Sequence, residues 1–163
     1  MAVQKILVAV DRSSQAPVVF EQALELADKG GSSLMVFHSF KLNPEQDTNP
    51  LLGIGTLGDV DTYGTLERLR HESLRKDIEQ VKTWLKAYAE QATAKNIPTE
   101  IDCKLGNPSS MICQAAQSWG ADLIVLGRRG YKGLSEILLG SVSNYVLHHA
   151  PCSVLVVQGI QSA

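Results

Sequence analysis

Hydrophobic residues in this chain gather into five short segments of strand length, separated by stretches with helical spacing. The first, second and fourth segments are continuous or nearly continuous apolar runs, which is the pattern of strands buried on both faces. The third follows Pro98, and the fifth begins at Pro151. We predict strands over KILVAV (5–10), SLMVFHSF (33–40), TEIDCKL (99–105), ADLIVLG (121–127) and PCSVLVVQ (151–158).

A helix is predicted directly after the first strand, which ends at an aspartate. Ser13 or Ser14 can cap this helix, and Pro17 is tolerated in its first turn. Apolar residues then keep helical spacing until Gly30 and Gly31 stop it.

Three further helices are predicted between the later strands. The second helix, from Thr65 to about Lys95, is dense in charged residues, with apolar residues tracing one face, so its charges form a solvated face. That face carries Leu66, Leu69, Leu74, Ile78, Val81, Leu85 and Tyr88. The third helix is PSSMICQAAQSWG (108–120). The fourth opens at Gly140 and Ser141 and places Val142, Tyr145, Val146 and His149 at helical spacing.

Residues 41 to 64 show neither a strand nor a helix period and are rich in Pro, Gly, Asn and Asp. We predict a long mobile loop, and a loop of this length in a small domain is usually functional. GIGTLG (53–58) within it matches the dinucleotide fingerprint G-x-G-x-x-G, but it follows no strand and opens no obvious helix. We expect this segment to cover a bound ligand or contact a partner.

Alternating strands and helices predict parallel βαβ units with helices on both faces of one sheet. At 163 residues the chain fits one domain, residues 1–163. The expected fold is α/β, a doubly wound, Rossmann-like parallel sheet of five strands with four helices. Ligands in such sheets bind at the carboxyl ends of the strands where the winding reverses.

Composition restricts the classes of function. A net charge of −2 disfavours binding to nucleic acid or to an anionic membrane surface. The N-terminal sequence lacks the features of a signal peptide and no apolar stretch approaches a membrane span, so we expect a cytoplasmic protein. Cys103, Cys113 and Cys152 form no C-x-x-C pair, and buried free thiols are expected rather than disulfides or a zinc site.

The segment GRRGYKGLSEILLGS (127–141) follows a predicted strand and leads into a helix. Gly127 and Gly130 permit backbone dihedrals that other residues avoid and let a ligand lie against the main chain. Gly140 and Ser141 open a helix whose unpaired N–H groups and positive dipole end favour an anion. The spacing therefore predicts a nucleotide-phosphate site, although a single glycine here is also explained by a tight turn.

Other candidates for chemistry are weaker. Asp11 is well placed for a ribose or a metal, and capping of the first helix region explains it nearly as well. His148 and His149 are adjacent and so point different ways, which makes them a poor metal pair; we expect a surface His148 and a core His149. His38 at a strand end is expected to be structural. The chain has no Walker lysine motif and no Gly-x-Ser-x-Gly elbow, so no catalytic residue is assigned.

The spacing Gly127-x2-Gly130-x9-Gly140-Ser141, together with ILVAVD near the N-terminus, Gly106 with Pro108 and the closing SVLVV, resembles the universal stress protein family, specifically its nucleotide-binding branch. The resemblance covers almost the whole chain apart from residues 41 to 64. It implies a strand order of 3-2-1-4-5, a homodimer, and an adenine nucleotide bound between the first and fourth strands.

Carried over position by position, the resemblance implies that Asp11 and the backbone around Ala9 and Val10 meet the adenosine, and that the main chain at Ser39 meets the adenine edge. The ribose and phosphates would lie near Gly127, Arg128, Arg129 and Gly130, and the phosphates would be held by Gly140, Ser141, Val142 and Ser143.

Two of these positions depart from common members of the family. Arg128 and Arg129 replace a smaller or histidine-containing pair, and they either strengthen phosphate binding or are simply exposed. Ser39 stands where an aliphatic residue is frequent, which a contact through backbone atoms alone would tolerate.

These features favour a dimeric ATP- or AMP-binding sensor or regulator of the stress response, with Mg²⁺ able to accompany a triphosphate. A slow ATP hydrolase using Asp11 or a bound metal, and a partner-binding module with a vestigial nucleotide site, stay open as alternatives. An independent feature concerns the dimer. If the last strand (Ser153 to Val157), which is apolar on both faces, lies at the sheet edge, it invites pairing with a second copy.

Overall fold

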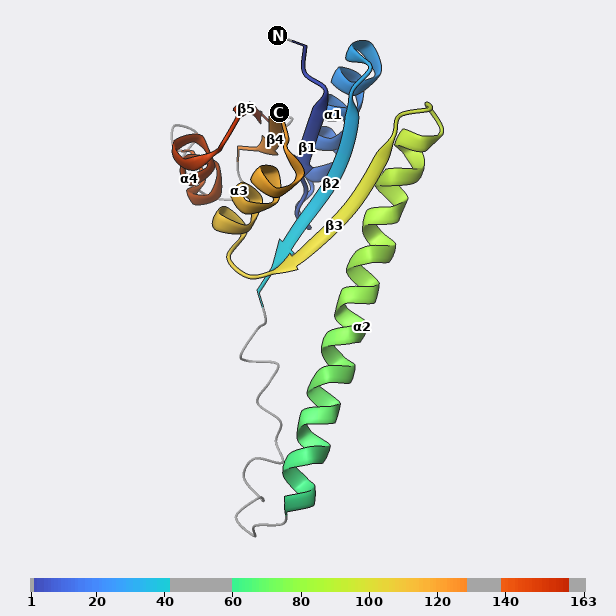
Figure 1. Ribbon diagram of the computed structural model, residues 1–163, viewed down its shortest axis with the longest axis vertical. Coiled ribbons are helices and arrows are strands. Elements are labelled where there is room, and N and C mark those ends of the chain that lie inside the picture. The colour runs from blue at the N-terminus through green and yellow to red at the C-terminus, as the bar shows by residue number, and fades with distance from the viewer. Residues whose placement is uncertain (1, 42–59, 129–138, 159–163) are drawn as a thin grey trace.

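The computed structural model describes residues 2–41, 60–128 and 139–158. In these residues five strands form one parallel sheet in the order β3-β2-β1-β4-β5 (Figure 1). The strands are β1 (Lys5–Ala9), β2 (Ser33–Phe40), β3 (Thr99–Leu105), β4 (Leu123–Gly127) and β5 (Ser153–Val157). The helices are α1 (Ala16–Gly30), α2 (Val60–Thr93), α3 (Pro108–Trp119) and α4 (Ser141–His149). The predicted α/β class and strand order are confirmed.

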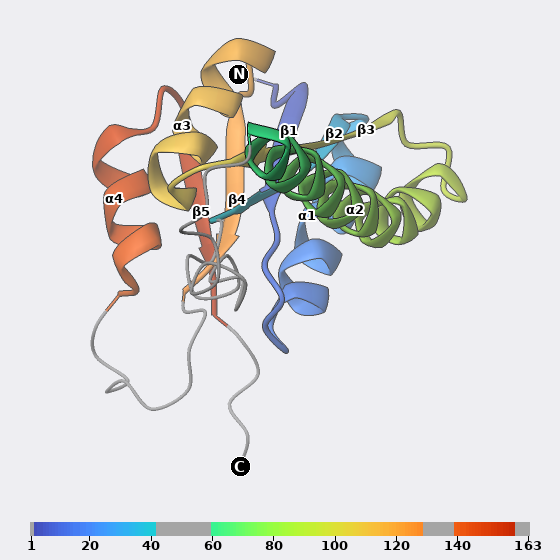
Figure 2. The same cartoon turned by 90° about the horizontal axis from the view of Figure 1, so that it is seen from below.

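Two layers of helices cover the sheet, α1 and α2 on one face and α3 and α4 on the other (Figure 2). Successive residues of a strand point to opposite faces, so Ile6 and Val8 of β1 enter the core under α1 and α2, while Leu7 enters the core under α3 and α4. Both sides of β1 are therefore apolar, which explains why this strand is a continuous hydrophobic run.

The start of α1 differs from the prediction. Its N-cap residue is Gln15, whose side chain makes no capping hydrogen bond, so neither Ser13 nor Ser14 caps the helix. The N–H and the hydroxyl of Ser13 instead donate to the carboxylate of Asp11, and the Ser13 Oγ accepts from the N–H of Gln15 at 3.3 Å, before the helix begins. The predicted stop is confirmed, because Gly31 adopts the left-handed conformation (φ 68°) and its N–H bonds to the carbonyl of Ala27.

Helix α2 begins at Val60, inside the segment predicted to be loop, while residues 42–59 lie outside the described part. Its C-terminal half packs on β2 and β3, and its N-terminal half projects beyond the sheet (Figure 1). Val81 and Leu85 are accordingly buried, whereas Leu69 is 51% exposed, so only part of the expected apolar face is covered. Of the helices that the structure describes, none combines the length and the hydrophobicity that a membrane crossing needs.

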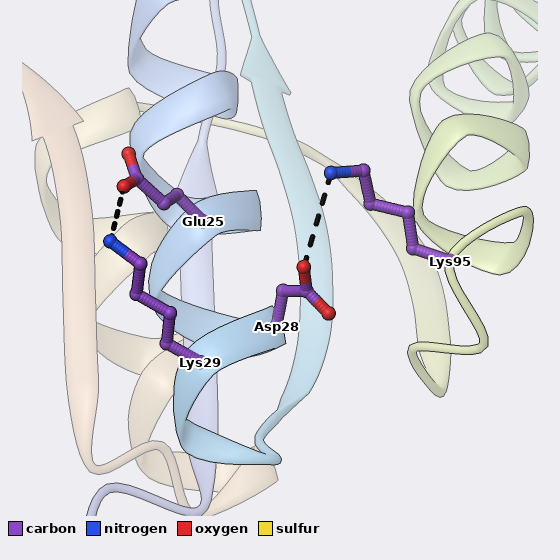
Figure 3. A network of polar contacts seen from close by, with 4 residues as sticks. All are labelled: Glu25, Asp28, Lys29 and Lys95. Carbon is purple, nitrogen blue, oxygen red and sulfur yellow. Dashed lines mark hydrogen bonds and ion pairs between the residues drawn. The ribbon is translucent and has the colours of Figure 1, made fainter.

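The ends of α1 and α2 lie side by side, and charged residues mark this contact (Figure 3). Lys95, just after α2, approaches Asp28 of α1 with 3.9 Å between Nζ and Oδ2, and Glu25 pairs with Lys29 one turn along α1. These side chains are about half exposed or more, so each pair adds little to stability.

The three cysteines are free thiols, as predicted, but they are only partly buried. Burial raises the pKa of each, which keeps Cys103, Cys113 and Cys152 protonated at neutral pH.

Candidate functional site

A cavity of about 690 Å³ opens where the carboxyl ends of β1 and β4 separate, within the usual range for small-molecule sites. From β1 the chain winds outward to β2 and β3, and from β4 it winds outward to β5, so the crevice lies where the winding reverses. All the predicted site residues that the structure describes line this one cavity. They are Ala9, Val10, Asp11, Ser39, Gly127, Arg128, Gly140, Ser141, Val142 and Ser143. Arg129 and Gly130 lie outside the described residues.

Hydrogen bonds tie the start of α4 to the end of β4. The hydroxyl of Ser143 donates to the carbonyl of Gly127 at 2.8 Å and lies 3.1 Å from the carbonyl of Arg128. The N–H of Gly140 donates to that same Arg128 carbonyl at 3.0 Å. The Ser143 hydroxyl proton and the Gly140 amide are therefore engaged within the protein, so the Gly140 amide is not one of the unpaired N–H groups expected at the start of this helix.

The amides of Ser141, Val142 and Ser143 differ from that of Gly140. These residues are the first three of α4, and the first N–H groups of an α-helix have no acceptor within the helix. They lie at the positive end of the helix dipole, beside the cavity. This end of the cavity is chemically suited to an anion.

At Gly127 the lack of a side chain matters, whereas its backbone conformation does not. Gly140 has φ −59° and ψ 155°, and Gly127 does not have a positive φ. An unusual backbone conformation therefore does not explain the presence of glycine at either position. This corrects the expectation of special backbone conformations at Gly127. A Cβ at Gly127 would lie 3.1 Å from Val19 Cγ2, so a larger residue would crowd α1 against β4.

The opposite end of the cavity presents main-chain groups of β2. The carbonyl of Phe37 accepts from the N–H of Val10 at 2.9 Å, so Phe37 directs its peptide groups toward β1. The carbonyl of Phe40 accepts from Gly106 at 3.0 Å, toward β3. The direction of the peptide groups alternates from one strand residue to the next, so those of Ser39 point the same way as those of Phe37. Strand β1 ends at Ala9, opposite Phe37. The peptide groups of Ser39 consequently point past the end of β1 into the crevice.

The side chains near this end are engaged within the protein. Ser39 donates from Oγ to the carbonyl of Gly106 at 3.1 Å. His38 Nδ1 lies 2.7 Å from the carbonyl of Val10, and because a carbonyl only accepts, Nδ1 carries the proton. Burial lowers the pKa of His38, so its ring is neutral at pH 7. These contacts give His38 the structural place expected of it.

Asp11 follows β1 at the cavity edge, and its Oδ1 accepts from both the N–H (3.0 Å) and the hydroxyl of Ser13. The carboxylate thus orders the turn before α1, in line with the structural alternative, and its second oxygen is not part of this turn. In the described part of the chain, no group of three or more His, Cys, Asp or Glu side chains could hold a metal ion.

His148 and His149 lie away from the cavity, and both are exposed. The prediction of a core position for His149 is wrong. Its ring stacks on Tyr145 with centroids 4.0 Å apart, and its Nδ1 lies 2.9 Å from the Tyr145 carbonyl, because both residues occupy the outer side of α4.

The cavity also contains residues that the sequence motifs did not indicate. Phe37 and Phe40 of β2 and Ile112 of α3 supply apolar lining, and Arg12 supplies a cation. Arg12 could have been found from its place beside Asp11 at a strand end. Ile112 could not, because only the packing of α3 brings it to the site.

Comparison with known proteins agrees with this fold and cavity. The model of the universal stress protein family matches residues 2–158. Universal stress protein Sll1388 of Synechocystis sp. is 40% identical over 161 residues, which is 97% of this chain and 99% of the relative.

Solved structures of lower identity share the fold. The hypothetical protein MJ0577 superposes with a TM-score of 0.76 at 22% identity, over 99% of this chain and 100% of its own. A universal stress protein in complex with cAMP (TM-score 0.64, 20% identity, 96% and 98% coverage) and one from Archaeoglobus fulgidus in complex with dAMP (0.60, 23%, 96% and 98%) do so as well. Because the family model spans nearly the whole chain and a relative of matching length is 40% identical, the chain belongs to the universal stress protein family.

Proposed function

We propose that this protein binds an adenine nucleotide, ATP or AMP, in the cavity between β1 and β4 and acts as a dimeric sensor or regulator of the stress response. The observation that carries the proposal is the placement of two kinds of main-chain group in one cavity. Peptide groups of Ser39 face one end, and the first amides of α4 face the other.

The Ser39 end suits an adenine edge. Adenine presents a ring nitrogen that accepts and an amino group that donates, and a strand residue offers one N–H and one carbonyl in the same direction. Guanine presents the reverse pattern, a ring N–H and a carbonyl oxygen. The apolar rings and chains of Phe37, Phe40 and Ile112 around this end suit a flat, weakly polar base.

The α4 end suits phosphate. Main-chain N–H groups of Ser141, Val142 and Ser143 would donate to phosphate oxygens, with Arg128 nearby and Arg129 and Gly130 proposed from the sequence. A hydrogen bond to a charged group contributes about 1.5–3 kcal/mol, so a few such bonds plus base burial reach micromolar affinity, about −8.2 kcal/mol. Mg²⁺ would accompany a triphosphate through phosphate oxygens and water, since these residues offer it no protein cage.

Solved relatives support the adenine assignment. Two proteins of this fold bind cAMP and dAMP, and both ligands carry the base and at least one phosphate that the two ends of the cavity would hold.

Isothermal titration calorimetry with ATP, AMP and GTP tests the proposal. We expect micromolar binding of ATP or AMP and at least tenfold weaker binding of GTP. Gly140→Val should abolish binding while circular dichroism stays unchanged. The control is Gly64→Val, a change in the projecting half of α2 with open space around the new side chain. Absence of heat with both adenine nucleotides would remove the proposal.

The dimer is proposed to form through β5. This strand is at the sheet edge, and Leu155 on it is 37% exposed. The N–H of Arg128 donates to the carbonyl of Val157 at 3.1 Å, so the peptide groups of the odd-numbered residues of β5 face β4. The peptide groups of Val154 and Val156 therefore point outward from the sheet edge. A second copy pairing along this edge would satisfy those groups.

Sedimentation velocity tests the dimer. Leu155→Glu should shift the protein from dimer to monomer, because the two-fold axis would bring the two charges together in the interface. Leu69→Glu, at an exposed leucine of α2, is the matched control and should leave the dimer intact. A wild-type protein that sediments as a monomer at micromolar concentration would contradict the dimer.

A further inference from the structure

Arg12 lines the cavity, yet the contacts of the proposed function do not use it. It directly follows Asp11 beyond the end of β1, and its side chain reaches α2. The guanidinium carbon lies 4.1 Å from the centroid of the Trp84 ring, which is a cation–π contact. Among the described residues, Arg12 forms no ion pair with a carboxylate. An aromatic face therefore holds this charge at the rim of the cavity.

The charge balance of the cavity makes this cation relevant to an anionic ligand. The described charged residues that line it are Asp11, Arg12 and Arg128. Asp11 repels a phosphate, so binding of a polyphosphate gains from each nearby cation. The charges of Arg12 and Asp11 both affect the pKa of His38 and that of Tyr88, Asp11 raising and Arg12 lowering each, so both charges lie near these two side chains.

Trp84 is held by its neighbours, whereas Arg12 is exposed. The indole meets the ring of His38 edge-on at 5.0 Å and that of Tyr88 at 5.8 Å. His38 is in turn bonded to the carbonyl of Val10, a lining residue of the cavity. Of the two partners in the cation–π contact, Arg12 is the more exposed.

We propose that Arg12 is a charge-sensing residue of the nucleotide site: its guanidinium leaves the face of Trp84 and binds phosphate oxygens when an anionic nucleotide enters. This inference rests on the proposed function of the cavity. Hydrogen bonds between guanidinium and phosphate, often bidentate, are stronger than a cation–π contact at an exposed site, so the exchange favours the phosphate. Departure of Arg12 uncovers one face of Trp84 and thereby transmits occupancy of the site to α2.

Fluorescence of Trp84 tests the exchange directly. The second tryptophan, Trp119, lies on α3 across the sheet, so Trp119→Phe leaves Trp84 as the single reporter. In this background ATP should change Trp84 emission, whereas adenosine, which lacks phosphate, should bind without that change. Arg12→Gln should abolish the response and weaken ATP binding about tenfold while leaving adenosine binding unchanged. Arg12→Lys keeps the charge and should retain more ATP affinity than Arg12→Gln.

The control variant is Arg75→Gln, which removes one positive charge from an exposed position of α2 and should behave as wild type. Calorimetry on the same samples separates the two proposals. Binding of ATP without a change in Trp84 emission, or an equal change with adenosine, would overturn the role of Arg12 alone. Absence of any nucleotide binding would overturn the proposed function and this role with it.

Discussion

The hydroxyl of Ser143 in the first turn of α4 donates to the carbonyl of Gly127 at the end of β4, 2.8 Å away and sixteen residues earlier in the chain. This hydrogen bond ties the start of α4 to the end of β4. It makes Ser143, which is 2% exposed, a residue that shapes the candidate site through the main chain.

Replacement of this serine tests that role. Ser143→Ala leaves the carbonyl of Gly127 without its hydroxyl donor, and we expect a loss of about 1–2 kcal/mol in the free energy of unfolding, a drop of about 2–8 °C in Tm. Calorimetric unfolding checks the value against Ser118→Ala, an exposed serine of α3 whose loss should change Tm by less than about 1 °C. Equal Tm values for the two variants would contradict this role.

The close approach of Gly127 to Val19 gives a second prediction. Gly127→Val should destabilise the protein by about 1–3 kcal/mol, because the first added carbon already lies 3.1 Å from Val19 Cγ2. In the double variant with Val19→Ala, space is returned, so the combined loss should be smaller than the sum of the single losses. A double-mutant cycle by urea denaturation measures the coupling, and strict additivity would show that the two positions do not crowd each other.

Stability should fall in mild acid because of His38. Burial lowers its pKa from the ordinary value of 6.5, and Arg12 adds to this, against the opposing Val10 hydrogen bond and Asp11. The unfolded chain therefore binds more protons, so stability is full above about pH 6.5 and declines as pH falls from there toward the folded-state pKa. The decrease in Tm between pH 7.5 and 5.5 should be smaller in His38→Gln than in wild type. An unchanged decrease would assign the acid sensitivity to other groups.

The two halves of α2 should contribute unequally to the stability of the protein. Leu85 is fully buried and Leu69 is 51% exposed on the same helix. Leu85→Ala should cost about 2–5 kcal/mol, because it leaves a cavity under α2, whereas Leu69→Ala should cost less than about 0.5 kcal/mol. Chemical denaturation of both variants gives the comparison, and a large loss at Leu69 would show that the projecting half of α2 is packed against something in solution.

The hydrophobic pattern along the chain predicts the strands and the fold class, and the family resemblance adds most of the residues that line the crevice. This was possible because β1 and β4 are buried on both faces, so hydrophobic runs mark them. Asp11, just beyond β1, and Gly127, the last residue of β4, mark their carboxyl ends. The strand order came from the family resemblance, which the fold confirms.

The hydrogen bonds and contacts of individual groups in the site depend on three-dimensional packing. The amide of Gly140 donates to the carbonyl of Arg128, and the hydroxyl of Ser143 donates to the carbonyl of Gly127. Arg12 makes a cation–π contact with Trp84, seventy-two positions away in the chain. His149 faces outward despite its helical spacing with apolar residues. The partner of each polar group depends on which residues lie within hydrogen-bonding distance in the folded chain. The periodicity of the sequence carries no information about distances between residues that are far apart in the chain.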